Sequence, residues 1–227
     1  MLPLWEENPA RRAAPVAPVL VIAANLGVFI HEVMLAMQDP RVLEAFIGAH
    51  ALVPGRLVAD WDQAREWKTL FTHMFIHGGV AHVAGNCWFL WVFGKSVEDR
   101  LGSMKFILFY LLCGLAAAGL QVAAEPHSAL PMLGASGAIS GVLGAYLIMF
   151  PTAWIVTLVP WIVPIIPVPA FLFLIVWFVF QTLNGVGSML SGADAAGGVA
   201  WWAHAGGFTA GVILILWAKG AGLVRRS

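Results

Sequence analysis

Several polar side chains stand inside, or just before, segments of this sequence that are otherwise almost entirely apolar. These residues are His73, His77, His82, Asn86, Ser136, Ser140 and His204. An unpaired polar group in the lipid core is costly, so each of them is a candidate functional residue. A serine next to a histidine can also react, because the imidazole can accept the hydroxyl proton and leave a nucleophilic oxygen.

Glycine spacing indicates how a serine and a histidine far apart in the sequence could meet. Ser136 lies in GASGAISG, where a stripe of glycines begins at Gly137. His204 lies in HAGGFTAG and shares one helical face with Gly207 and Gly211. Such stripes let membrane helices approach until their backbones touch. If the two segments pack through these glycines, Ser136 and His204 come within hydrogen-bonding distance.

Each of these residues has a simpler explanation when it is considered alone. A serine in a membrane helix usually bonds back to a carbonyl of the preceding turn, a lone histidine is more often structural, and glycines can serve packing only. His82 and Asn86, four residues apart, present both side chains on one face of a third segment. The conjunction of three such segments favours a functional site over three unrelated structural features.

The overall composition points to a membrane. The chain has 227 residues, of which 60% are hydrophobic and 11% are charged, with a formal net charge of zero. A soluble domain usually carries about 25% charged residues, so this composition predicts a polytopic membrane protein. The balanced charge gives no indication of a nucleic-acid partner. Cys87 and Cys113 lie in apolar segments and are expected to be buried rather than to form a disulfide or a metal site.

Six apolar stretches are long enough, or nearly so, to cross a bilayer as helices. They cover about 16–37, 80–97, 106–124, 135–150, 168–183 and 199–219. Lysines and arginines cluster before the first stretch, between the second and third, and after the sixth, which places both termini in the cytoplasm by the positive-inside rule. The expected organisation is a tail of residues 1–15, a six-helix membrane domain of residues 16–219 and a tail of residues 220–227.

Two connecting segments on the external side stand out. The first, residues 38–76, is long and rich in tryptophan and phenylalanine, which suits a structure lying in the headgroup layer, although an ordinary external loop is the alternative. The second, residues 185–198, has five glycines in fourteen residues. It is expected to be either a mobile cap over the site or a slack linker.

Three motifs, in order on the second, fourth and sixth of these segments, resemble those of one protein family. HGGVAHVAGN at 77–86, GASGAISG at 134–141 and WWAHAGGFTAG at 201–211 are similar to motifs of the rhomboid family of intramembrane serine proteases, and GKSVEDRLGSMKF after the second segment extends the likeness. The resemblance covers about residues 16–219. It implies an all-α, six-transmembrane-helix rhomboid-like bundle with a long interfacial loop between the first two helices.

The resemblance also implies a role for each motif residue. Ser136 falls on the family's nucleophile and His204 on its general base, while His82, Asn86 and the Ser136 backbone N–H fall on the groups that stabilise the oxyanion. Further residues are expected to shape the site without reacting, and these are His77, Gly134, Gly137, Gly207 and Gly211. No aspartate or glutamate of the spans accompanies the serine and the histidine, so a dyad is expected.

The chain departs from the family pattern at two positions. The family often has Trp-Arg in the first loop, where this chain has Trp67 and Lys68, and lysine cannot form the same planar forked hydrogen bonds. Several members have an aromatic residue four positions after the nucleophile, packed on the catalytic histidine, where this chain has Ser140. The second departure raises the question of how the imidazole of His204 is held.

As a rhomboid-like protein, the chain is expected to cleave proteins with a single transmembrane segment, near the external end of that segment and without a cofactor or a metal. Its compact form most resembles bacterial members, which implies the cytoplasmic membrane. Two alternatives remain open. One is a non-proteolytic rhomboid-fold protein that binds membrane clients. The other is a metal site or metal transporter built on histidines, namely His73, His77, His82 and His204.

Overall fold

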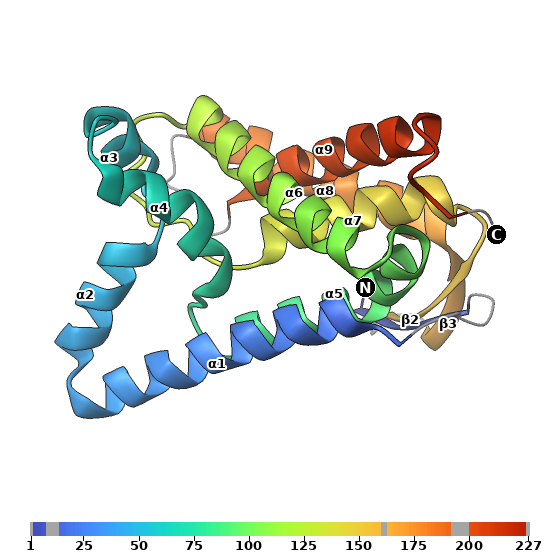
Figure 1. Ribbon diagram of the computed structural model, residues 1–227, viewed down its shortest axis with the longest axis horizontal. Coiled ribbons are helices and arrows are strands. Elements are labelled where there is room, and N and C mark those ends of the chain that lie inside the picture. Colours follow the sequence, from blue (N-terminus) through green and yellow to red (C-terminus); the bar gives the residue numbers. More distant parts are fainter. Residues whose placement is uncertain (1, 8–13, 160–162, 192–199, 226–227) are drawn as a thin grey trace.

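A computed structural model describes residues 2–7, 14–159, 163–191 and 200–225, and within this part the chain is mostly helical (Figure 1). The elements follow in the order β1 (Leu2–Glu7), α1 (Val16–Gln38), α2 (Pro40–His50), α3 (Pro54–Ala59), α4 (Ala64–Thr72), a 3₁₀ turn η1 (His73–Phe75), α5 (Val80–Leu101), α6 (Ser103–Ala124), α7 (Ser136–Met149), β2 (Trp154–Val159), β3 (Val163–Pro169), α8 (Ala170–Ser191) and α9 (Trp201–Gly220).

Helices α1, α5, α6, α7 and α9 coincide with predicted apolar stretches to within a few residues, whereas α8 continues beyond the predicted end at residue 183 to Ser191. Among the described residues, α1, α6, α8 and α9 are long and apolar enough to cross a membrane. α5 is as long as α6 but ends in the charged sequence VEDRL, and α7 has only 14 residues. This arrangement confirms a polytopic helical membrane protein with a rhomboid-like bundle.

The short helix α7 occupies the centre of the bundle. Its residues from Gly137 to Tyr146 are all buried, because α5, α6 and α9 pack around it. The core continues from α7 into α5 and α8, where the ring of Phe93 contacts those of Tyr146 and Phe173. A helix that lies entirely inside protein needs no polar face, which is why its sequence is apolar on every side.

α7 and α9 are in backbone contact through their glycines. A Cβ atom added to Gly207 would overlap the carbonyl oxygen of Gly137, and one added to Gly211 would overlap that of Gly141. Only glycine allows this approach, so the predicted glycine stripes interlock. The consequence for the site is that the N-terminal ends of α7 and α9 lie side by side.

The segment between α1 and α5, expected to be a long external loop, forms α2, α3, α4 and η1. Asp39 begins α2 by accepting a hydrogen bond from the N–H of Arg41 (2.9 Å), with Pro40 in the first turn. The aromatic side chains of Trp61, Trp67 and Phe71 are exposed, as an interfacial position requires. The position of the segment in the headgroup layer stays a prediction.

Arg56 of α3 provides forked hydrogen bonds close to where Lys68 departs from the family pattern. Its guanidinium donates to the buried carboxylate of Glu66 (2.6 Å) and to the carbonyl oxygens of Gly48 (2.7 Å) and Ala51 (3.0 Å). These bonds join α2, α3 and α4. They use the planar fork of a guanidinium, which a lysine does not have.

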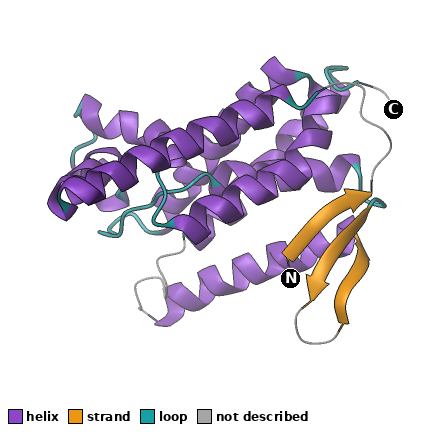
Figure 2. Ribbon diagram, turned by 90° about the horizontal axis from the view of Figure 1, so that it is seen from below, coloured by secondary structure: helices purple, strands orange, loops and turns teal. Residues whose placement is uncertain are grey.

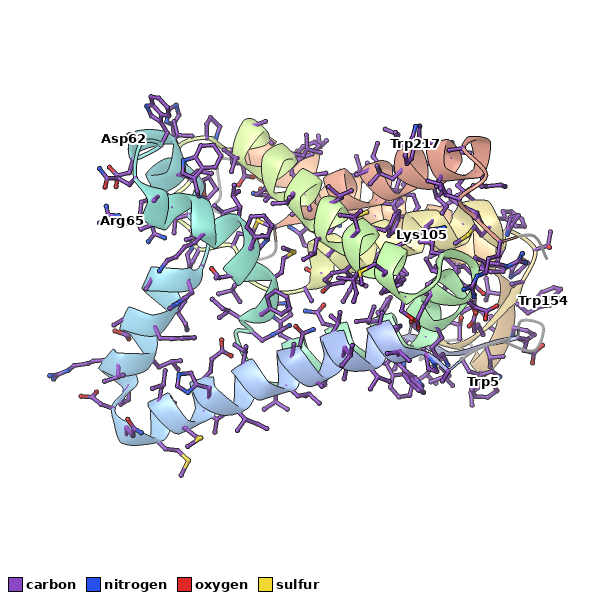
Figure 3. All side chains as sticks on the ribbon, viewed as in Figure 1. Trp5, Asp62, Arg65, Lys105, Trp154 and Trp217 are labelled. Carbon is purple, nitrogen blue, oxygen red and sulfur yellow. The ribbon has the colours of Figure 1, made fainter. Side chains whose placement is uncertain are left out.

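A small antiparallel sheet, which the sequence did not predict, lies at one end of the helical bundle (Figure 2). Residues 2–7, expected to belong to an N-terminal tail, pair as β1 with β2, and β2 pairs with β3. Trp88 of α5 donates to the carbonyl of Pro3, and Ser96 bonds Glu6. Figure 3 shows Trp5 and Trp154 at this end of the molecule and Asp62 and Arg65 at the opposite end.

The glycine-rich segment 185–198 is only partly described. Residues 185–191 continue α8 to Ser191, so this part is helix rather than loop. Residues 192–199, the rest of the expected cap or linker, lie outside the described residues.

Candidate active site

The side chains of Ser136 and His204 are in contact. Ser136 is the first residue of α7 and His204 is in the first turn of α9, and the Ser136 Oγ and His204 Nε2 atoms lie 2.7 Å apart. The start of α9 is anchored by Gln121 of α6, whose side-chain oxygen accepts a hydrogen bond from the N–H of Ala203 (3.1 Å). The packing of α7 on α9 thus brings together two residues 68 positions apart.

Gly134 shapes the turn that leads into α7. Its φ of +112° lies in a region that favours glycine. A Cβ atom at this position would also lie 2.6 Å from His82 Nε2 and 3.4 Å from Asn86 Nδ2, so no other residue leaves room for these side chains. The N–H of Gly134 donates to the carbonyl of His73 (2.8 Å), which ties the turn to η1.

His82 and Asn86 of α5 direct nitrogen atoms to the same place beside the turn. The His82 Nδ1 atom accepts a long hydrogen bond from the N–H of Gly78 (3.4 Å), which leaves the proton on Nε2, the atom nearest Gly134. The buried Asn86 Nδ2 has no hydrogen-bond partner among the described residues. Both nitrogens therefore lie beside Gly134, two residues before Ser136, and are available there as hydrogen-bond donors.

A cavity of about 740 Å³ opens over these groups. Its lining includes His82, Asn86, Ser136, Gln181 and His204, and both Ser136 and His204 are partly exposed. The walls come from the start of α5, the turn before α7, α8 and the first turn of α9. A cavity of this size admits water and an extended peptide segment.

Two residues that were not predicted from the sequence hold the other side of His204. The Gln181 Oε1 atom lies 2.8 Å from His204 Nδ1, and the ring centroid of Trp177 is 6.0 Å from that of His204. Both belong to α8. Ser140, at the position where many family members have an aromatic residue, instead donates its hydroxyl to the Ser136 carbonyl (2.6 Å). Gln181 could have been found by the criterion used for the other candidates, because it is also a polar side chain within an apolar span.

Glu32 of α1 is a further polar residue buried next to the site. Its carboxylate oxygens accept hydrogen bonds from the backbone N–H of His77 (3.2 and 3.3 Å), and the side chain is 2% exposed. The ring of His77 packs edge-on against that of His82, with 5.2 Å between the centroids. Glu32 therefore supports the turn on which His82 depends. The roles of His77 and the glycines stay predictions.

Metal binding receives no support from the geometry of the histidines. His73 is buried and its Nδ1 atom is hydrogen-bonded to the Thr69 carbonyl (2.8 Å), and burial lowers the pKa of His73 to about 4. Among the described residues, no group of three or more His, Cys, Asp or Glu side chains could hold a metal ion. The donors at the site face the cavity beside a serine, an arrangement suited to acyl transfer.

Comparison with known proteins identifies the family. The model of the Rhomboid domain family matches residues 64–219. Rhomboid protease GluP of Bacillus subtilis is 44% identical over 82 residues, which are 36% of this chain and 16% of GluP. The putative rhomboid protease YdcA of Bacillus subtilis is 34% identical over 120 residues, 51% of this chain and 60% of YdcA.

A plant relative matches most of the chain. Rhomboid-like protein 11, chloroplastic, of Arabidopsis thaliana is 28% identical over 210 residues, which are 92% of this chain and 66% of that protein. The chain thus spans less than two thirds of the length of each of these three relatives. The family match covers well over half of the chain and includes Ser136 and His204. This protein, a multi-pass membrane protein, belongs to the rhomboid family.

Proposed function

We propose that this protein is an intramembrane serine endopeptidase with a dyad of Ser136 and His204. The observation that carries the proposal is the 2.7 Å contact between Ser136 Oγ and His204 Nε2 inside a cavity that water can enter. Further support comes from the relatives GluP and YdcA, whose names describe proteases.

In the proposed reaction, His204 Nε2 takes the proton from the Ser136 hydroxyl as the oxygen attacks the carbonyl carbon of a peptide bond. The carbonyl oxygen becomes an oxyanion, which accepts hydrogen bonds from Asn86 Nδ2, His82 Nε2 and the Ser136 N–H. The protonated imidazole then gives its proton to the leaving amine nitrogen, and the C–N bond breaks. An acyl-enzyme remains on the serine.

Water completes the reaction. His204 removes a proton from a water molecule as that water attacks the ester carbonyl, and the same proton returns to the serine oxygen when the C–O bond breaks. The products are a new carboxylic acid and the free enzyme. The 740 Å³ cavity gives water a route to the ester.

The proposed substrates are membrane proteins with a single transmembrane segment that reach the site from the lipid bilayer. A peptide bond in a regular helix is covered by its own hydrogen bonds, so the segment must unwind locally before Ser136 can attack. Glycine or serine near the cleavage site lowers the cost of that unwinding. We place the protein in a bacterial cytoplasmic membrane with both termini in the cytoplasm, since its basic residues cluster at one end of the spans.

The test is cleavage of a model single-pass substrate by the purified protein in liposomes. Wild type is expected to cut the substrate and to be labelled by a fluorophosphonate, while Ser136→Ala is expected to do neither and still to fold. Undiminished cleavage by Ser136→Ala would overturn the assignment. A wild-type protein that binds the substrate but is neither active nor labelled would instead be a client-binding protein.

A further inference from the structure

Gln181 is a buried amide in an otherwise apolar part of α8, within the sequence VWFVFQTL. Its side chain is 6% exposed and lines the same cavity as Ser136 and His204. The Oε1 atom is 2.8 Å from His204 Nδ1, the nitrogen on the far side of the ring from Ser136. Ser136, His204 and Gln181 therefore form one continuous hydrogen-bonded chain across α7, α9 and α8.

Which atom donates in each of these hydrogen bonds follows from the chemistry proposed for Ser136. If the serine hydroxyl donates to His204 Nε2, that nitrogen carries no proton, and a neutral imidazole then carries its proton on Nδ1. An N–H at Nδ1 needs an acceptor, and the amide oxygen of Gln181 is at hydrogen-bond distance. The amide thus selects the tautomer in which Nε2 can act as a base.

α8 also supplies a ring contact. Trp177 is four residues before Gln181, so both side chains lie on one face of the helix. The Trp177 ring is tilted by 37° to the imidazole at 6.0 Å, and Trp201 meets the imidazole edge-on at 6.3 Å. Ser140 cannot make such a contact, because serine has no ring, and its hydroxyl bonds to the Ser136 carbonyl instead. The imidazole is therefore oriented by Trp177 and Gln181 of α8 together with Trp201 of its own helix, α9.

We propose that Gln181 is a positioning residue for His204: its amide oxygen holds the Nδ1 proton and fixes the orientation of the ring in which Nε2 meets the Ser136 hydroxyl. This inference rests on the proposed serine protease function. It assigns to a neutral amide the role that a carboxylate has in a Ser-His-Asp triad. A neutral partner fits a site in the membrane, since it adds no buried charge.

The test compares Gln181→Leu, which removes the acceptor at similar volume, with Gln181→Glu, which keeps an acceptor in reach of Nδ1. Gln181→Leu is expected to lower kcat for the model substrate about 10- to 100-fold, because a buried N–H loses its partner, with KM within about twofold. Gln181→Glu is expected to retain or exceed the wild-type kcat. Its acid limb in the pH–rate profile should move to higher pH, since a carboxylate favours the protonated imidazole.

Neighbouring groups and a matched variant control these measurements. His82 is the other titratable side chain lining the cavity among the described residues. The pH profiles are therefore repeated with His82→Asn present in every variant, while Asn86 is kept. Asn184→Leu removes another amide of α8, one that among the described residues donates to the Phe180 carbonyl of its own helix (2.7 Å), and it should leave kcat unchanged. Thermal unfolding in detergent confirms that each variant folds.

The possible outcomes separate the inference from the proposed function. If Ser136→Ala is inactive while Gln181→Leu keeps the wild-type kcat and pH profile, the protein is a serine protease and the role of Gln181 is wrong. If Gln181→Glu is as impaired as Gln181→Leu, the amide donates to Nδ1 rather than accepting from it, and the proposed direction is overturned. If Ser136→Ala is active, the proposed function itself fails.

Discussion

Gly207 of α9 lies directly against the carbonyl oxygen of Gly137 of α7, so that the backbones of the two helices touch beside the candidate dyad. A methyl group on Gly207 must push the helices apart, and Gly207→Ala is expected to cost about 1–3 kcal/mol of stability. Because the same displacement separates Ser136 from His204, fluorophosphonate labelling should fall even in the folded fraction.

The control for this substitution is Gly119→Ala on α6, where an added Cβ atom meets nothing within 4 Å. It should leave the labelling unchanged and the unfolding temperature unchanged or slightly raised, since alanine favours a helix more than glycine does. Equal behaviour of the two variants would contradict a direct link between the α7–α9 contact and the dyad.

Asn86 provides a second prediction, because its Nδ2 atom is buried without a partner among the described residues. A donor that is unpaired in the resting protein and bonded in the transition state contributes to kcat rather than to folding. Asn86→Ala is expected to lower kcat about 100- to 1,000-fold, with the unfolding temperature unchanged or raised. The check is steady-state kinetics beside thermal unfolding, and a variant that loses stability but keeps kcat would refute the oxyanion role.

Glu32 gives a third prediction. Its carboxylate accepts the backbone N–H of His77, so Glu32→Leu leaves a buried donor without a partner and is expected to destabilise the protein by about 1–3 kcal/mol and to reduce activity. Glu32→Gln keeps an acceptor oxygen and should therefore lose less stability and less activity than Glu32→Leu. Glu44→Leu, at an exposed position of α2, is the matched control for removal of a carboxylate.

The contribution of Glu32 is measured by denaturant or thermal unfolding together with substrate cleavage. A Glu32→Leu protein as stable and as active as Glu44→Leu would show that the hydrogen bond to His77 is dispensable.

The buried His73 predicts how stability depends on pH. Burial lowers the pKa of His73 in the folded protein to about 4, against an ordinary value of 6.5, so between these values the unfolded chain binds a proton that the folded one does not. The contribution of His73 to the free energy of unfolding is therefore fully present above about pH 6.5. It is lost as the pH decreases to 4, by up to about 3 kcal/mol. His73→Asn keeps a donor for the Thr69 carbonyl without titrating, and thermal unfolding from pH 7 to pH 4.5 should show a shallower loss. An unchanged slope would assign the acid sensitivity to other groups.

The helical part of the fold could be predicted because each apolar run is long and bounded by charges or glycines. The contact between Ser136 and His204 followed from glycine spacing, since interlocking glycines leave few ways for two helices to pack. The strands Trp154–Val159 and Val163–Pro169 were missed because their residues are as apolar as those of a span, and the second strand includes prolines. From the sequence, nearly all of these residues were expected in the loop between the fourth and fifth spans, which were predicted at 135–150 and 168–183.

Other relationships depend on how distant elements are placed, which spacing alone does not determine. Gln181 meets His204 only because α8 lies against α9, and Arg56 reaches Glu66 only because α3 folds back on α4. The sequence did indicate that Gln181 was unusual, since it is an amide inside an apolar helix. The partner of that amide could be identified only in three dimensions.

The pairing of β1 with β2 has a consequence for biosynthesis. Residues 2–7 emerge from the ribosome well before their partners, residues 154–158, which follow about 150 residues later. At roughly 5–20 residues per second, the N-terminal segment waits about 8–30 seconds before its strand can form, while the intervening helices are inserted. The sheet can therefore close only after α1, α5, α6 and α7 have been made, and its closure marks a late stage in the assembly of the nascent chain.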